Sequence, residues 1–225
     1  MSLFVILIIS YLLGSIPTAI IVSRIVMKDD IRKHGSGNAG ATNVFRVMGW
    51  KAALFVVLVD VGKGTVATLF VSKIGVGSVV LDAALVQMLA GLAAIIGHVW
   101  TVFAGFRGGK GMGTAFGVLV ALAPVASLIS LVVWLILVLT IRIVSVGSMT
   151  AGVVFPATLL IQRFVLKSDI PDPLLGLAVV LGILVFITHR SNIRRLLRGE
   201  ENRFGSKKKK KSNNHAESLN AHLSE

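Results

Sequence analysis

The chain has 225 residues, of which 55% are hydrophobic, and its mean hydropathy is +0.86. A soluble domain of this length could not bury so much apolar surface in one core, so the composition excludes an ordinary soluble domain and indicates an integral membrane protein. The net charge is +13 and there is no cysteine, which excludes a thiolate nucleophile, a thiolate metal site and disulfides.

Seven apolar stretches follow one another along the chain. The first lacks the basic start and the cleavage site of a signal peptide, so we expect it to be a retained span. A bilayer crossing takes about 20 apolar residues, so the two stretches on either side of Pro124 are short and could instead form one overlong helix. The stretches are 3–27, 52–71, 81–103, 112–123, 125–141, 146–166 and 174–188.

Lys and Arg gather in three polar segments, at 28–51, at 107–110 and after residue 188. Basic loops stay in the cytoplasm, and seven spans, unlike six, put all three segments on that side. The sequence therefore predicts an all-α membrane protein with seven transmembrane helices, its N-terminus outside and its C-terminus cytoplasmic. Residues 1–204 form this domain, and 205–225, with the lysines at 207–211, form a disordered basic tail that can lie against anionic headgroups. No aromatic residue interleaves the lysines, which argues against nucleic acid.

The first polar cluster, Gly35 to Asn43, reads Gly-Ser-Gly-Asn-Ala-Gly-Ala-Thr-Asn and is followed by Arg46. Glycines let consecutive backbone N–H groups converge, and a nearby arginine adds charge, so this run can cradle an oxyanion. The alternative is a flexible turn between helices.

The second cluster, Phe106 to Thr114, reads Phe-Arg-Gly-Gly-Lys-Gly-Met-Gly-Thr and opens into the next apolar stretch. A nucleotide-binding P-loop would need a glycine and a Ser or Thr where the chain has Ala104 and Gly111, so the motif fails. Glycine N–H groups, Lys110 and the start of a helix remain, and these favour a bound anion. The segment predicts a phosphate seat.

The third cluster runs from His189 to Glu201 and is expected to continue the last span as a helix. A basic collar that snorkels to the headgroups explains its arginines without a function. His189 can exchange protons, Asn192 can orient a hydroxyl or a phosphate, and Glu201 can position a basic partner.

Two charged residues, Asp60 and Lys63, lie inside the second apolar stretch at a spacing that suits an ion pair. The pair is either structural or part of a pocket that extends from the cytoplasmic face. His98 is expected to pack or cap at the membrane interface.

With these clusters in order, the chain resembles the bacterial acyl-phosphate-dependent glycerol-3-phosphate acyltransferases, the PlsY-type membrane family. The resemblance covers about residues 4–204, and its motifs are Gly35–Asn43 with Arg46, Gly97-His98 with Phe106–Gly111, and His189–Ile193 with Arg195, Gly199 and Glu201. Thr101 stands where the family has proline, and Met112-Gly113 replaces Val-Ala. These departures put in doubt the rigidity of the second cluster and the acyl-chain preference.

The resemblance implies transfer of a fatty acyl group from acyl phosphate to the sn-1 hydroxyl of glycerol 3-phosphate, the first acylation of phospholipid biosynthesis. It implies a multi-pass protein of the bacterial plasma membrane whose active site faces the cytoplasm, with no cofactor and no metal. The residues it assigns to catalysis are His189, Lys110 and Ser36. Those it assigns to substrate binding are Ser36, Asn38, Thr42, Asn43, Arg46, Gly108, Gly109, Lys110, Gly111, Ser145, His189, Asn192 and Glu201.

Acyl phosphate is already activated, so we expect direct transfer without an acyl-enzyme. Ser36 as a nucleophile, with His34 or His189 as its base, is the alternative. For direct transfer the base is His189 or a substrate phosphate. None of the histidines has an aspartate five residues later, which excludes the acyl-CoA-dependent class, and the contrasting function is an anion or phosphate transporter.

Overall fold

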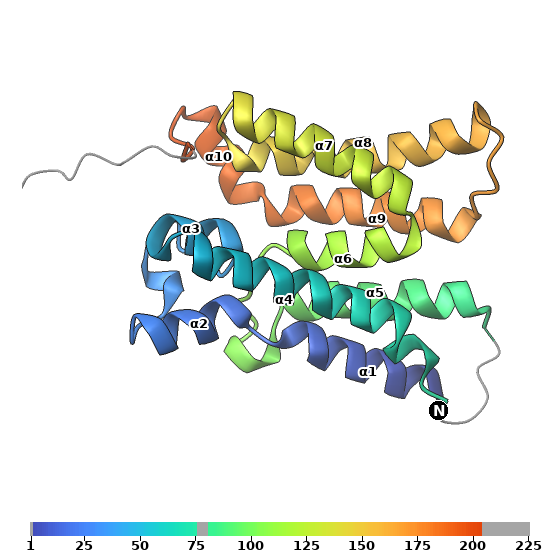
Figure 1. The fold of residues 1–225 in the computed structure, drawn as a ribbon, viewed down its shortest axis with the longest axis horizontal. Coiled ribbons are helices and arrows are strands. Elements are labelled where there is room, and N and C mark those ends of the chain that lie inside the picture. Colours follow the sequence, from blue (N-terminus) through green and yellow to red (C-terminus); the bar gives the residue numbers. More distant parts are fainter. Residues whose placement is uncertain (1, 76–80, 204–225) are drawn as a thin grey trace, which may run out of the picture.

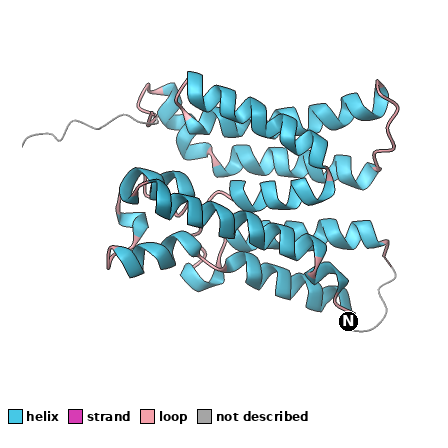
Figure 2. Ribbon diagram, viewed as in Figure 1, coloured by secondary structure: helices cyan, strands magenta, loops and turns pink. Residues whose placement is uncertain are grey.

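The computed structural model describes residues 2–75 and 81–203, and within them every regular element is a helix (Figure 2). The predicted basic tail at 205–225 lies outside the described residues. The α-helices are α1 (Ser2–Ser15), α2 (Thr18–Val26), α3 (Ala41–Met48), α4 (Trp50–Leu69), α5 (Ala83–Val99), α6 (Met112–Leu122), α7 (Pro124–Thr140), α8 (Val144–Phe164), α9 (Asp172–Thr188) and α10 (Arg190–Leu197). Short 3-10 helices lie at Ile31–Lys33, Val71–Lys73 and Val102–Ala104.

The long helices run side by side along one direction (Figure 1). α1 packs on α5, α4 on α6, and α8 on both α7 and α9. The short helices α3 and α10 lie at one end of the bundle, and the N-terminus lies at the other end. The polar clusters of the sequence are thereby collected at one end.

Close contact between α4 and α6 depends on glycine. A Cβ on Gly117 would lie 2.0 Å from the Val61 carbonyl oxygen, and a Cβ on Gly64 would lie 2.2 Å from that of Thr114. Both distances are far below van der Waals contact, so these two helices can approach this closely only without those side chains.

Four candidate spans are long and apolar enough to cross a membrane, at 3–26, 50–73, 83–104 and 144–164. A fifth is possible if α9 and α10, which meet at a bend of 56°, count as one. Two shorter apolar helices, α6 and α7, lie on either side of Pro124, so the predicted break there is confirmed. Proline suits the first turn of α7 because the N–H it lacks would have no helical partner. The helical membrane architecture is confirmed, whereas seven complete spans stay a prediction.

Two of the predicted helices are broken. The stretch 3–27 divides at Ile16-Pro17 into α1 and α2. The expectation that the third cluster continues the last span was wrong, because α9 ends at Thr188 and α10 leaves at 56°. Both breaks free backbone groups from the helical ladder and leave them available to other partners.

The buried pair Asp60 and Lys63 uses one of these breaks. Lys63 Nζ lies 3.0 Å from Asp60 Oδ1 and also donates to the freed Ile16 carbonyl at 3.1 Å. Thr18 donates to the same carboxylate at 3.3 Å. The ion pair expected from the sequence is confirmed, and it ties α4 to the junction of α1 and α2.

A candidate active site at the polar end of the bundle

One continuous cavity of about 790 Å³ opens at the polar end and extends between α6, α7, α8 and α9. Residues of all three polar clusters line its polar end, and apolar side chains line the deeper part. A long apolar branch joined to a polar mouth suits a molecule with a charged head and a hydrocarbon tail.

Four helices begin at the polar end of this cavity. Within the described chain, the first turns of α3, α6, α8 and α10 all lack a side-chain cap. Their leading residues at 41–43, 112–113, 144–145 and 190–192 all line the cavity. The leading N–H groups of these turns have no side-chain cap, and the helix dipole adds partial positive charge. The four N-termini together make a strongly anion-attracting surface.

Asn43 holds the first cluster in shape. Its side-chain amide donates to the carbonyls of Ile31, His34 and Asn38 at 3.2, 2.9 and 3.1 Å, and its Oδ1 accepts from the Ser36 N–H at 2.8 Å. The side chain is 1% exposed. Asn43 therefore acts on the site by folding the loop, and its own polar atoms are already used. Ser36 and Asn38 line the cavity as a result.

Thr42 and Arg46 on α3 also line the polar end. His34 does not, because its Nε2 lies 2.9 Å from Asp29 Oδ2 and faces that carboxylate. No hydrogen bond joins the Ser36 hydroxyl to a histidine within the described residues. This geometry favours Ser36 as a ligand over Ser36 as a nucleophile.

The second cluster packs directly on the last turn of α5. Gly108 N–H donates to the Val99 carbonyl at 3.1 Å, and Gly109 N–H donates to the His98 carbonyl at 3.2 Å. A Cβ on Gly108 would lie 2.0 Å from the His98 carbonyl oxygen, and a Cβ on Gly109 would lie 2.2 Å from His98 Nε2. Only glycine fits at either position, and His98, which is 8% exposed, forms the floor of the loop.

Lys110 joins the second cluster to the third. Its Nζ donates to Asn192 Oδ1, and Asn192 Nδ2 donates to Glu201 Oε1 at 2.6 Å. Glu201 also accepts from Ser145 Oγ at 3.1 Å and, through Oε2, from Arg195 Nε at 2.7 Å. Four of the residues assigned to the site by sequence thus meet in one network, and Glu201 is its centre.

Burial shifts the pKa of two groups in this network. It lowers the pKa of Lys110 to about 8, with the positive charges of Arg195 and Arg46 acting in the same direction and Glu201 opposing them. Burial, followed by the charge of Lys110, lowers the pKa of His189 to about 4. At neutral pH Lys110 is therefore mostly charged and His189 is neutral.

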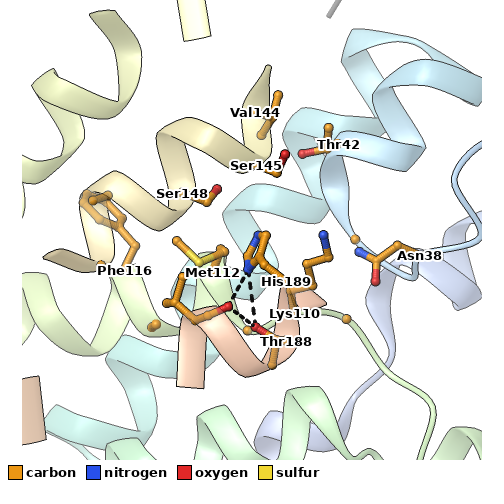
Figure 3. Close-up of a pocket in the computed structure, with 18 of the residues that line it drawn as sticks. Asn38, Thr42, Lys110, Met112, Phe116, Val144, Ser145, Ser148, Thr188 and His189 are labelled. Carbon is orange, nitrogen blue, oxygen red and sulfur yellow. Dashed lines mark hydrogen bonds between the residues drawn. The ribbon is translucent and has the colours of Figure 1, made fainter. Parts of the chain in front are cut away.

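The orientation of His189 follows from its backbone contact. Its Nδ1 lies 2.8 Å from the Val185 carbonyl oxygen, so in the neutral ring the proton is assigned to Nδ1 (Figure 3). Nε2 then carries a lone pair and can accept a hydrogen bond. Lys110 and His189 both lie beside the cavity in the same view, with Ser145 and Thr42 across from them.

The apolar branch was not identified from the sequence. Its walls include Met112, Phe116, Trp134 and Phe155. In a membrane protein, lipid-facing and cavity-facing apolar residues look alike in a sequence, so no pattern separates them. Within the described residues, no group of three or more His, Asp or Glu is placed to hold a metal ion.

Comparisons with known proteins match the chain to one family and one fold. The family profile described as "Glycerol-3-phosphate acyltransferase" matches residues 4–199. A glycerol-3-phosphate acyltransferase of Chlorobium luteolum is 44% identical over 90% of this chain and 97% of its own length, and one of Chlorobaculum tepidum is 41% identical over 92% and 99%. The crystal structure of PlsY (YgiH), an integral membrane glycerol 3-phosphate acyltransferase, in its glycerol 3-phosphate form is 39% identical, with a TM-score of 0.80 over 91% of this chain and 96% of that one. Its lysophosphatidic acid form gives a TM-score of 0.77.

Proposed function

The chain belongs to the glycerol-3-phosphate acyltransferase family, and we propose that it transfers a fatty acyl group from acyl phosphate to the sn-1 hydroxyl of glycerol 3-phosphate. The products are 1-acylglycerol 3-phosphate and inorganic phosphate. The observation that carries the proposal is the single cavity with an anion-attracting mouth and an apolar branch. Both substrates are phosphates, and one of them bears a long tail.

Two phosphate seats are available at the mouth. The N-terminus of α6, with Lys110 and Gly111, takes the phosphate of the donor, where negative charge increases as it leaves. Gly108 and Gly109, whose N–H groups donate to the end of α5, hold the loop that carries Lys110. The loop before α3, with Ser36 and Arg46, takes glycerol 3-phosphate. Arg46 lies exposed at the mouth, where a water-soluble acceptor arrives.

The acceptor hydroxyl lies near His189 and Asn192 in this arrangement. The hydroxyl oxygen attacks the acyl carbonyl carbon, the bond from that carbon to the phosphate oxygen breaks, and phosphate leaves with the electron pair. His189 binds a proton weakly, because its pKa is about 4, so its Nε2 serves to orient the hydroxyl. A substrate phosphate, whose second pKa is about 6, is the better proton acceptor.

Two groups hold this arrangement in place. Glu201 fixes Asn192 and Arg195, and Ser145 supports the carboxylate from α8. The apolar branch receives the acyl tail of the donor. An anion transporter would instead place its polar site near the middle of the bilayer, and the described polar clusters gather at one end of the bundle (Figure 1).

Donor choice tests this function. Purified protein in lipid is given glycerol 3-phosphate with acyl phosphate, acyl-CoA or acyl carrier protein as donor, and 1-acylglycerol 3-phosphate is measured by mass spectrometry. Of the three donors, we expect only acyl phosphate to give product. A folded preparation that makes no product from acyl phosphate would show the proposal to be wrong, and transport of phosphate into proteoliposomes without acylation would favour a carrier.

We also propose seven spans, with the N-terminus outside and the active site in the cytoplasm of a bacterial plasma membrane. α3 and α10 lie at one end of the bundle and the N-terminus lies at the other end, which supports this sidedness (Figure 1). α6 has 11 residues and is only about 16 Å long, so in this arrangement it crosses with the help of the loops at its ends.

Cysteine labelling tests this arrangement, because the chain has no cysteine of its own. In intact spheroplasts, a membrane-impermeant maleimide should label Ser168→Cys and should leave Arg198→Cys unlabelled until the membrane is permeabilised. Both positions are exposed, and they lie beyond opposite ends of α9. Labelling of both or of neither in intact spheroplasts would contradict the predicted topology.

A further inference from the structure

The apolar branch has a definite depth. On α8 the residues that line it run from Val144 to Phe155, and on α9 they run from Thr188 back to Ala178. α6 contributes residues as deep as Leu119. α8 packs on α9, so the lining residues of these two helices reach a similar depth, and on α7 the lining extends to Ser127 (Figure 1).

Phe155 is the deepest residue of α8 that lines this branch. It is 3% exposed and belongs to a buried cluster with Leu159 and Ala178, which are 0% and 1% exposed. Beyond them lies a separate cavity of about 340 Å³, lined among others by Ala126 and Leu174 of the same cluster. The two cavities share no lining residue, and the buried cluster that contains Phe155 and Leu159 contributes residues to both linings.

The distance from the polar mouth to Phe155 is comparable with the length of an extended acyl chain. Ser145 and Phe155 are ten residues apart on one helix, and at 1.5 Å per residue this is about 15 Å. An extended polypeptide spans up to 3.6 Å over three bonds, so an extended hydrocarbon advances about 1.2 Å per bond. About 12 carbons therefore reach from the mouth to Phe155.

We infer that Phe155 terminates the acyl cavity and sets the acyl-chain length that the enzyme prefers. The inference rests on the proposed function, since it takes the occupant of the apolar branch to be the tail of acyl phosphate. A chain that fills the branch up to Phe155 is accepted, and the extra methylenes of a longer chain must coil beside it.

The enzyme discriminates between acyl chains of different length by steric fit at the end of the branch. The tail arrives from the bilayer, where its methylenes are already in hydrocarbon, so the cavity gains little from burying one more of them. Overpacking a closed end is unfavourable, because side chains or backbone must move to accept extra methylenes. Chain length is therefore selected by where the branch stops.

Residues one helical turn on either side of Phe155 allow the length to be changed in both directions. Ala151 lines the cavity four residues nearer the mouth, and Leu159 lies four residues deeper. One turn is about 5.4 Å. Phe155→Ala should lengthen the branch towards Leu159 by about four carbons, and Ala151→Phe should shorten it by a similar amount.

The test is an internal competition. Equal amounts of acyl phosphates of 10, 12, 14, 16 and 18 carbons are supplied together with glycerol 3-phosphate, and the 1-acylglycerol 3-phosphates are quantified by mass spectrometry. Product ratios do not depend on how much enzyme is folded. We expect Phe155→Ala to raise the ratio of 18-carbon to 12-carbon product about tenfold, Phe155→Leu to raise it less, and Ala151→Phe to lower it about tenfold. Val153→Ala, at an exposed position outside the cavity, is the matched control and should leave it unchanged.

Unchanged ratios in both Phe155→Ala and Ala151→Phe would overturn the inference, because the tail would then leave the bundle sideways into the lipid without reaching Phe155. Failure of the proposed function looks different, since the unmodified protein would then form no product with any of the five donors.

Discussion

Replacing Lys110 with alanine is expected to lower kcat/KM for acyl phosphate by about 1000-fold or more. The ammonium group lies beside the free N-terminus of α6 and donates to Asn192, so its loss removes the charge nearest the leaving phosphate. Removing a single preorganised donor of this kind from an active site lowers kcat by about 100- to 1000-fold, and Lys110 also supplies a full charge. The measurement is steady-state kinetics with both substrates varied.

A matched control is Lys73→Ala. Lys73 is exposed, ends the short 3-10 helix that follows α4, and does not line the cavity. Its activity should equal that of the unmodified protein. Size-exclusion chromatography and circular dichroism should give the same results for both variants. If Lys110→Ala turns over at a nearly normal rate, Lys110 has no place in the site.

The lowered pKa of Lys110 adds a pH signature to the same experiment. Below its pKa of about 8 the amine is charged and attracts phosphate, and as the pH rises through 8 that charge is lost. We expect kcat/KM to fall above about pH 8 as a consequence. Bound phosphate favours the charged amine, so the corresponding fall in kcat should occur at higher pH. Lys110→Arg, which stays charged, should remove this fall even if its activity is lower.

The sequence predicted the membrane helices to within a few residues, because their apolar composition is decided by the bilayer and needs no tertiary information. It missed the break at Ile16-Pro17, although Pro17 is a residue type that interrupts helices, because the apolar stretch continues on both sides. It also missed the bend at His189, where the basic residues that follow are compatible with a continuous helix. In both places packing and hydrogen bonds with other helices, such as that from Lys63 to Ile16, favour the interruption.

The polar half of the candidate site was predictable because charge and glycine are conspicuous in an apolar chain. Which of these residues bind ligand and which hold the loops in shape was not predictable, as Asn43 shows. Its residue type is equally suited to binding a ligand and to holding a loop, and only the four hydrogen bonds to Ile31, His34, Asn38 and Ser36 assign it to the loop. The convergence of four helix N-termini depends on tertiary packing and has no signal in the local sequence.

The glycines of the second cluster give the other large expected effect. Gly108→Ala would place a Cβ 2.0 Å from the His98 carbonyl oxygen and 3.0 Å from that of Val99. Both are backbone atoms of α5, so no side-chain rotation can relieve the contact, and the loop must lift away from the helix. Lys110, two residues on, moves with it. A displacement of about 1 Å at a reacting group can lower the rate about 100-fold, and we expect a loss of at least that size in kcat/KM.

Gly62→Ala is the matched control, since a Cβ there meets nothing within 4 Å and Gly62 lies within α4. Alanine is favoured over glycine in a helix by about 1 kcal/mol, so this variant should keep full activity and melt no earlier than the unmodified protein. The two substitutions add the same methyl group, against the backbone of α5 at Gly108 and into open space at Gly62. If Gly108→Ala retained activity equal to that of Gly62→Ala, the backbone contact between the loop and α5 would not be what positions Lys110. If instead it lost activity in step with a loss of folded protein, the contact would serve stability. An inactive but folded Gly108→Ala protein would show that the contact with the His98 and Val99 carbonyls positions the second cluster, including Lys110, for catalysis.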